Sequence, residues 1–191
     1  QVALDVLQMA LNNSDIPVRH QIIKALNRIR QRIKSPVFDK KQLKEYVREE
    51  TKRYALLKQS HLVLKASDHR RELLEGINEE IARSFENIFR LLGLIYNPND
   101  IYNVYKGIRS EKNALISESI EFLDNLIEWE VKKYLMPLFE SLLSDQNEYG
   151  PFEHEIETAG EALNYLAGLR HPTLHQLLAD LEQDVIANQR K

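Results

Sequence analysis

The sequence contains no cysteine, and it contains few residues that break helices. Without cysteine the chain has no disulfide, no thiol nucleophile and no cysteine-based zinc or haem site. Only 6 Gly and 6 Pro occur among 191 residues, of which 43% are hydrophobic and 29% are charged. This balance is typical of a globular, helix-rich chain rather than a disordered one, and the length favours a single domain.

Long hydrophobic runs are also missing. The longest strongly apolar stretch, LLGLIY at residues 91–96, is far shorter than the roughly 20 residues that a membrane-spanning helix needs. The chain opens at Gln1, inside an expected helix and without an initiator Met. We therefore expect a fragment of a longer protein, whose other regions would hold any chemistry.

The net charge of -3 hides an uneven distribution of charge. Residues 1–71 carry 16 Lys and Arg against 7 Asp and Glu, whereas residues 72–191 carry 10 against 22. One interpretation is a set of solvated helix faces that attract one another, and the other is a basic face that meets phosphates or an anionic membrane surface. Acidic residues interrupt the basic segment, which makes nucleic acid an unlikely partner. The candidate anionic-partner surface consists of Arg28, Arg32, Lys40, Lys41, Lys44, Arg70 and Arg71.

Apolar residues recur at helical spacing along nearly the whole chain. Turn signals divide it into a first helix pair at 1–35, a longer helical hairpin at 39–94, a second pair at 97–127 and closing helices at 130–188, which Pro137 interrupts. One kinked helix or two antiparallel helices fit residues 39–94, and the Ser67-Asp68 cap favours two. Asp39 has capping-box spacing to Gln42, and Asn97 precedes Pro98 as a helix cap. The sequence predicts one all-α domain of about 8–9 helices.

Two stretches of the chain repeat at an offset of 97 residues. LNNSDIPVRHQIIKAL at 11–26 faces a stretch from Ile108 to Leu123, and each predicts a helix, a short polar turn and a second helix. The first stretch resembles a HEAT repeat, which implies a right-handed α-α superhelix (a HEAT/armadillo-like solenoid) of stacked helix pairs. The resemblance also implies that Arg19 bonds to Asn13 or Asp15 in the turn. The second stretch departs from this pattern, with Ile116 in place of the Arg.

A second resemblance covers residues 85–143. IFRLLGLIYNPNDIYNVYKGIRS at 88–110, followed by SIEFLDNLI and YLMPLFESL, is similar to the HEAT-like cytosolic extension of bacterial carriers of the ATP/ADP translocase type. The resemblance implies the cytosolic tail of a nucleotide antiporter-like protein at the bacterial inner membrane. Its partner would be another protein or the membrane portion of its own chain. Transport residues belong to membrane helices in that family, so none is carried over.

No pattern in the sequence indicates catalysis. Gly107 in YKGIRS lacks the Gly-rich run and the Lys-Ser/Thr ending of a phosphate loop. His171 and His175 are four residues apart, but Pro172 separates them and no Glu supplies the base of a zinc protease, so capping or packing is the favoured role. The acids of FEHEIE at 152–157 fit a helix start better than a paired-acid site. We expect a protein that is not an enzyme and that has no cofactor and no metal ligands.

The stretch ALISESIEFLDNLI at 114–127 places Asp124 and Asn125 beside an apolar stripe at helical spacing. We expect both side chains to bond to backbone amides at the following turn or in a neighbouring repeat. Most aromatic residues are expected in the core between helices, and Trp129, between two Glu residues, is the expected partner contact. The favoured function is a regulatory or interaction tail of the antiporter-like protein. A free-standing HEAT-repeat scaffold is the alternative, ahead of a nucleic-acid binder.

Overall fold

The computed structural model describes residues 2–12, 15–33, 36–67, 71–110, 112–143 and 155–189. These residues form α-helices and connecting turns, with no β-strand among them, which confirms the all-α prediction. In chain order the helices are α1 (Val2–Ala10), α2 (Ile16–Arg32), α3 (Lys40–Ala66), α4 (Arg71–Ile95), α5 (Pro98–Ile108), α6 (Asn113–Leu126), α7 (Trp129–Glu140), α8 (Ala159–Gly168) and α9 (Pro172–Gln189).

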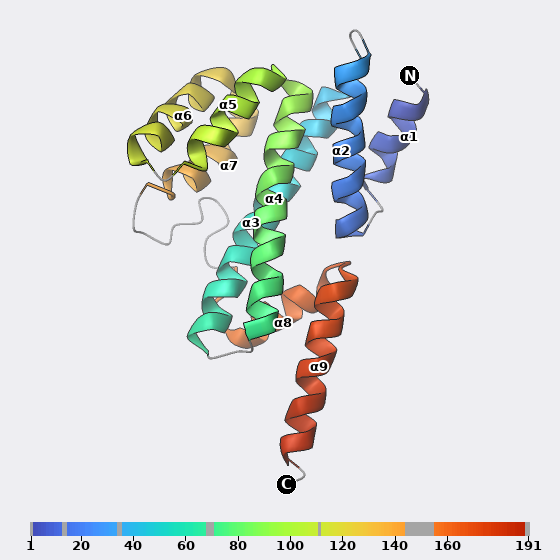
Figure 1. Cartoon of the computed structure of the whole chain (residues 1–191), viewed down its shortest axis with the longest axis vertical. Helices are drawn as coiled ribbons and strands as arrows, with labels where there is room; N and C mark the ends of the chain where they lie inside the picture. The colour runs from blue at the N-terminus through green and yellow to red at the C-terminus, as the bar shows by residue number, and fades with distance from the viewer. Residues whose placement is uncertain are drawn as a thin grey trace.

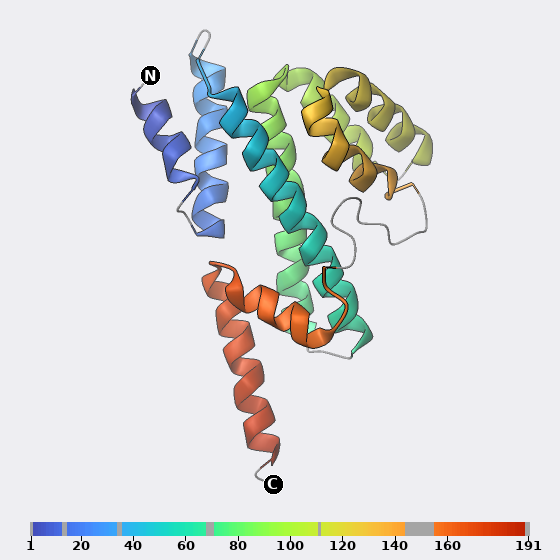
Figure 2. The ribbon, with the colours of Figure 1, turned by 180° about the vertical axis from the view of Figure 1, so that it is seen from behind.

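A long antiparallel hairpin of α3 and α4 is the centre of the molecule (Figure 1). The α1–α2 pair packs on one side of one end of the hairpin, and α5, α6 and α7 pack on the other side of the same end. Helix α8 crosses the opposite end, and α9 leads away from it (Figure 2). Segments 39–94 therefore form two helices, as the Ser67-Asp68 pair favours, although Asp68 itself lies outside the described residues.

Helices that are far apart in the sequence also pack against one another. In a solenoid each unit contacts the units next to it in sequence, whereas here α7 and α8 pack on α3, and α9 packs on α4. The backbone amide of Ile16 at the start of α2 also donates to the carbonyl of Arg170, 2.9 Å away, between α8 and α9. The right-handed superhelix of HEAT-like pairs stays a prediction.

The larger of two hydrophobic cores fills the end of the hairpin where α2, α5, α6 and α7 meet. At its centre Phe85 and Phe89 of α4 contact Tyr105 of α5 and Phe139 of α7, with ring centroids 5.1–6.0 Å apart. Such tilted and offset pairs stabilise more than their buried area alone. These four rings confirm the predicted aromatic core.

The smaller core lies at the other end of the hairpin, beneath α8 and α9. Leu57 and Ile77 of the hairpin contact Leu166 of α8 and Leu174 of α9 there, and all four are almost fully buried. Polar contacts hold the segment before α8 in place, since the amide of Ile156 donates to Gln59 Oε1 at 3.1 Å. Helix α8 and the first turns of α9 therefore pack on the hairpin, and the rest of α9 leads away from it.

The helix boundaries agree with the predicted caps at two positions. Asp39 accepts a bond from the Gln42 amide at 3.0 Å, and Asn97 accepts one from the Asn99 amide at 2.9 Å. The predicted interruption at Pro137 is wrong, because α7 runs through it from Trp129 to Glu140. Proline removes one intrahelical donor, and burial of both α7 turns around it against α3 keeps the helix continuous.

Candidate functional site

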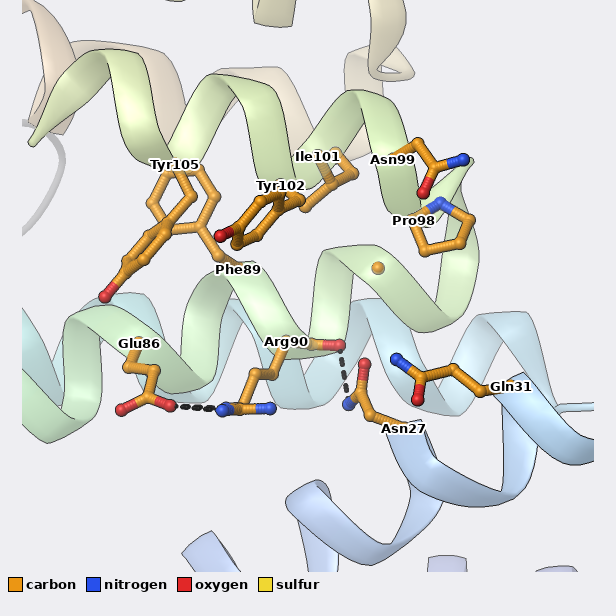
Figure 3. A pocket seen from close by; sticks show the side chains of 11 residues that line it. Asn27, Gln31, Glu86, Phe89, Arg90, Pro98, Asn99, Ile101, Tyr102 and Tyr105 are labelled. Atoms are coloured by element: carbon orange, nitrogen blue, oxygen red, sulfur yellow. Dashed lines mark hydrogen bonds and ion pairs between the residues drawn. The ribbon is translucent and has the colours of Figure 1, made fainter.

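A groove of about 450 Å³ lies between α2, α4 and α5 (Figure 3). Its size is that of a pocket for a small molecule or a short peptide. Helix α4 forms the floor, α5 forms one wall and α2 forms the other. The lining residues are Asn27 and Gln31 of α2, Glu86, Phe89, Arg90 and Gly93 of α4, and Pro98, Asn99, Ile101, Tyr102 and Tyr105 of α5.

Helix α2 runs parallel to α4, and hydrogen bonds from its side chains hold it against the carboxyl-terminal half of α4. Asn27 Nδ2 donates to the Arg90 carbonyl at 3.1 Å, and the Arg30 guanidinium donates to the carbonyls of Leu94 and, at 2.9 Å, Tyr96. The carbonyls of Leu94 and Tyr96 lie at the end of α4, where such groups lack partners within the helix. The α2 wall is therefore anchored by hydrogen bonds to backbone as well as by apolar packing.

Gly93 keeps the floor of the groove open. A Cβ atom added at Gly93 would contact only Asn27 Oδ1, at 3.6 Å, which is ordinary van der Waals contact. A longer side chain at this position would therefore extend into the groove instead of displacing a helix.

The α5 wall is aromatic. Tyr102 remains 59% exposed, whereas Tyr105 is half-buried against Phe89. Figure 3 places both tyrosine rings between the α5 and α4 ribbons. Lys106 Nζ lies 5.6 Å from the ring centre of Tyr102, and Arg109 lies 5.5 Å from that of Tyr105 while it donates to the Tyr105 hydroxyl at 2.7 Å. These cation–π contacts orient the rings.

The remaining lining groups are polar. Gln31 and Asn99 supply amides that can both donate and accept hydrogen bonds, whereas Asn27, whose Nδ2 already donates to the carbonyls of Ile23 and Arg90, offers its Oδ1 as an acceptor. Glu86 is the one carboxylate among the lining residues, and it forms an ion pair with Arg90 at 2.5 Å. Aromatic faces next to adaptable amides are suited to recognition of a planar or extended group.

A second polar cluster is buried where α2 meets the hairpin. Glu50 of α3 receives hydrogen bonds from Ser84 Oγ at 2.8 Å and Asn87 Nδ2 at 3.4 Å, and it pairs with Arg53 at 2.5 Å. Asn87 Oδ1 lies 2.7 Å from Nδ1 of His20 on α2. Burial lowers the pKa of Arg53, but Glu50, with Tyr165 and Glu49, more than compensates, so the pKa is raised overall. Because these groups satisfy one another, the cluster specifies how α2 sits on the hairpin.

Arg19 joins the edge of this buried cluster. Among the described residues it pairs with Glu49 of α3 at 3.3 Å, and the predicted bond to Asp15 does not form. Asp15 caps α2 by position without a side-chain hydrogen bond, and Asn13 lies outside the described residues. Burial and the nearby Arg53 lower the pKa of Arg19. Packing of α2 on α4 brings Glu49 of the neighbouring α3 within reach of Arg19, which no repeat pattern indicates.

Asp124 and Asn125 lie on the outer surface where α6 meets α7. Asp124 pairs with Lys132 of α7 at 2.9 Å, and Asn125 Nδ2 donates to the Glu121 carbonyl at 3.0 Å. Neither contact is the predicted bond to a backbone amide. Because α6 has ended by Leu126 and α7 turns back beside it, the first turns of α7 come within reach of Asp124.

The structure divides the predicted basic surface into several places. Lys44 is held by Glu128 at 2.5 Å and Glu130 at 2.6 Å, and these hydrogen bonds raise its pKa. Arg71 pairs with Glu75 at 2.7 Å. Lys40 and Lys41 are exposed in the first turn of α3, Arg28 and Arg32 are exposed on α2, and Arg70 lies outside the described residues.

His171 closes the turn between α8 and α9. Its Nδ1 atom accepts a hydrogen bond from the Leu174 amide at 3.1 Å, and its Nε2 atom lies 2.8 Å from Glu80 Oε1. The imidazole thus caps α9 and joins it to α4, which confirms the predicted capping role. His175 is exposed. Within the described ranges, no three His, Asp or Glu side chains gather as a set of metal ligands.

The groove has no signature of its own in the sequence. Helical spacing predicts Tyr102 and Phe122 in the core with the other aromatic residues, yet both are exposed. Trp129, the predicted partner contact, is exposed as well. Two signals were present: Lys106 and Arg109 each follow a tyrosine by four residues, and a glycine interrupts LLGLIY. Four-residue spacing predicts that cations cover those rings. It does not show that the rings face a groove.

The fold and the groove define an all-α domain with a surface suited to binding. No helix in the described part of the chain is both long and apolar enough to cross a membrane. Compared with known protein families, curated proteins and solved structures, the chain matches none.

Proposed function

We propose that this chain is a non-enzymatic interaction module that holds a short extended segment of a partner polypeptide in the α2–α4–α5 groove. The observation that carries the proposal is the composition of the groove. An aromatic wall faces a wall that carries amides, and Glu86, the one carboxylate among the lining residues, is paired with Arg90. Rings supply contact area at low entropic cost, and amides bond to peptide backbone.

The length of the groove favours an extended peptide. The α5 wall runs from Pro98 to Tyr105, which is seven helical steps or about 10 Å. An extended chain advances about 3.3 Å per residue, so about three residues span the wall. The contacts of three residues imply modest affinity, as is typical of regulatory contacts between tails and their partners.

The resemblance at residues 85–143 sets the proposed context. The module would be the cytosolic tail of an ATP/ADP antiporter-like nucleotide transport protein, and its helices would be HEAT-like repeats of a right-handed solenoid. The partner segment would then belong to the membrane portion of the same chain or to a second protein at the cytosolic face of the membrane. A free-standing HEAT-repeat scaffold remains the alternative context for the same groove.

Selection from a random peptide library displayed on phage tests the binding role. We expect the purified chain to enrich peptides that no longer bind two variants. Tyr102→Ala removes an aromatic ring from the α5 wall, and Gly93→Leu fills the floor of the groove. Phe122→Ala and Gly93→Ala are the matched controls. Phe122 is an aromatic residue of α6 with 49% exposure, so its loss costs as little packing as that of Tyr102.

The proposal fails if no peptide is enriched. It also fails if the enriched peptides bind Tyr102→Ala as tightly as the unchanged chain. Peptides selected by phage can then be compared with the remaining sequence of the parent protein, which would separate the antiporter-like tail from the free-standing scaffold.

A further inference from the structure

Basic side chains flank the groove on both walls. On α2, Lys24 precedes Asn27 by three residues and Arg28 precedes Gln31 by three, so helical periodicity places both cations beside the amide wall. On α5, Lys106 and Arg109 lie against the tyrosine rings, as described above. Helix α2 itself contains five basic residues and no acidic one.

The flanking cations are not neutralised by nearby acids. In the described part of the chain, no carboxylate forms an ion pair with the two α2 cations or the two α5 cations. The groove carboxylate, Glu86, is taken by Arg90. Asp100 precedes Tyr102 by two residues, roughly 200° around the helix, and so lies away from the groove. The rim therefore presents an excess of positive charge to an occupant.

The aromatic wall also selects the shape of an occupant. One turn of polyproline II helix contains three residues and rises about 3.1 Å per residue, close to the length of the α5 wall. Proline rings pack on tyrosine faces, and the carbonyls of this backbone are free to accept a hydrogen bond from an amide donor such as Gln31. Because this conformation is already restricted, less entropy is lost on binding.

We propose that the occupant of the groove is an acidic, proline-containing peptide segment, an inference that rests on the proposed peptide-binding function. The prolines would lie against Tyr102 and Tyr105, and the flanking Asp or Glu residues would meet the cations of both walls. Opposite charge at the rim would accelerate association and set the choice of partner more than it sets the final affinity. Binding should therefore weaken as salt increases.

Three labelled peptides test this inference by fluorescence anisotropy with the full chain. They are Glu-Asp-Pro-Pro-Asp-Glu, the same peptide with Lys and Arg in place of the acids, and the acidic peptide with Gly-Gly in place of Pro-Pro. We expect the acidic proline peptide to bind most tightly. Weakening of about 10-fold is expected for the basic peptide and severalfold for the glycine peptide, with the first difference reduced at high salt.

Charge-reversed variants locate the effect on the protein. Lys24→Glu with Arg28→Glu should weaken binding of the acidic peptide about 10-fold or more at low salt. Lys65→Glu with Lys133→Glu is the matched control, because it changes the net charge equally at two exposed positions away from the groove. Lys65 lies near the end of α3, at the opposite end of the hairpin (Figure 1). This control should leave binding within about twofold.

Each result has a definite meaning. Equal loss in the two double variants, or equal binding of acidic and basic peptides, overturns the inference. If the acidic peptide does not bind while other peptides still bind in a way that depends on Tyr102, the inference is overturned but the proposed function stands. The absence of any binding that depends on Tyr102 removes both. Failure of the acidic peptide together with rim-dependent binding of anionic phospholipid vesicles would assign the cations to a membrane surface and overturn the inference.

Discussion

Replacement of Glu50 with Ala should be among the most destabilising single changes in this chain. Only 1% of Glu50 is exposed, and its carboxylate holds Arg53 while it accepts bonds from Ser84 and Asn87. Removal of one member of a buried ion pair costs about 3–5 kcal/mol because the other charge stays buried without a partner. For a domain of this size each kcal/mol lowers the midpoint of thermal unfolding by about 2–4 °C, so we expect a decrease of roughly 6–20 °C.

Urea unfolding followed by far-UV circular dichroism measures this cost. A double-mutant cycle with Arg53→Met separates the pair from the rest of the cluster, because the double variant leaves no unpaired buried charge. We expect the double variant to be more stable than Glu50→Ala alone. Glu50→Gln, which keeps the shape and the Ser84 contact, should cost less than Glu50→Ala. A cost below about 1 kcal/mol for Glu50→Ala would refute the argument, because exposed ion pairs contribute no more than that.

Three further predictions concern packing, ionisation and capping. Gly107→Ala should lower the free energy of unfolding, measured in urea, by about 1–3 kcal/mol, because an added Cβ would lie 1.8 Å from Ser119 Oγ. The double variant Gly107→Ala with Ser119→Gly should recover most of that loss, and no loss in the single variant would contradict the close approach of α5 and α6. Burial raises the pKa of Tyr54 to about 12, so the contribution of this side chain to stability is complete below about pH 10 and is lost as the pH rises through 12. Tyr54→Phe should therefore flatten the decrease in stability over that range, measured by unfolding in urea, and an unchanged slope would contradict this assignment to Tyr54. Asn97→Ala should cost about 0.5–2 kcal/mol by removing the cap of α5, whereas Asn97→Asp should retain most of the stability, and equal losses in the two variants would contradict a capping role.

Local features of the fold were predictable because their causes are local. Asp39 and Asn97 cap helices through bonds to amides two or three residues away, and the sequence contains both partners of each bond. Spacing of apolar residues likewise predicts which helices form, since residues three and four apart share a face. Pro137 was misjudged because its effect depends on tertiary packing around α7, which no local rule describes.

The candidate site depended on contacts across long stretches of chain. Glu49 and Glu50 meet Arg19 and Asn87 from helices 30 or more residues away, so nothing near them in the sequence indicates their partners. The repeat pattern instead pointed Arg19 to the turn beside it. A charged residue in a helical pattern is usually assigned to solvent, and burial of Glu50 becomes evident only when α2 and α4 enclose it.

Sequence alone determined that this chain is helical, where most helices begin, and which side of each helix is apolar, because hydrogen bonding and periodicity within a helix involve near neighbours. Only the tertiary structure decided which apolar and aromatic side chains are covered. Phe89 and Tyr102 both follow helical spacing, but Phe89 is buried against rings of α5 and α7, while Tyr102 remains on a wall that no helix covers. The groove exists because α2 and α5 pack on α4 without meeting each other, and that arrangement is set by the whole core.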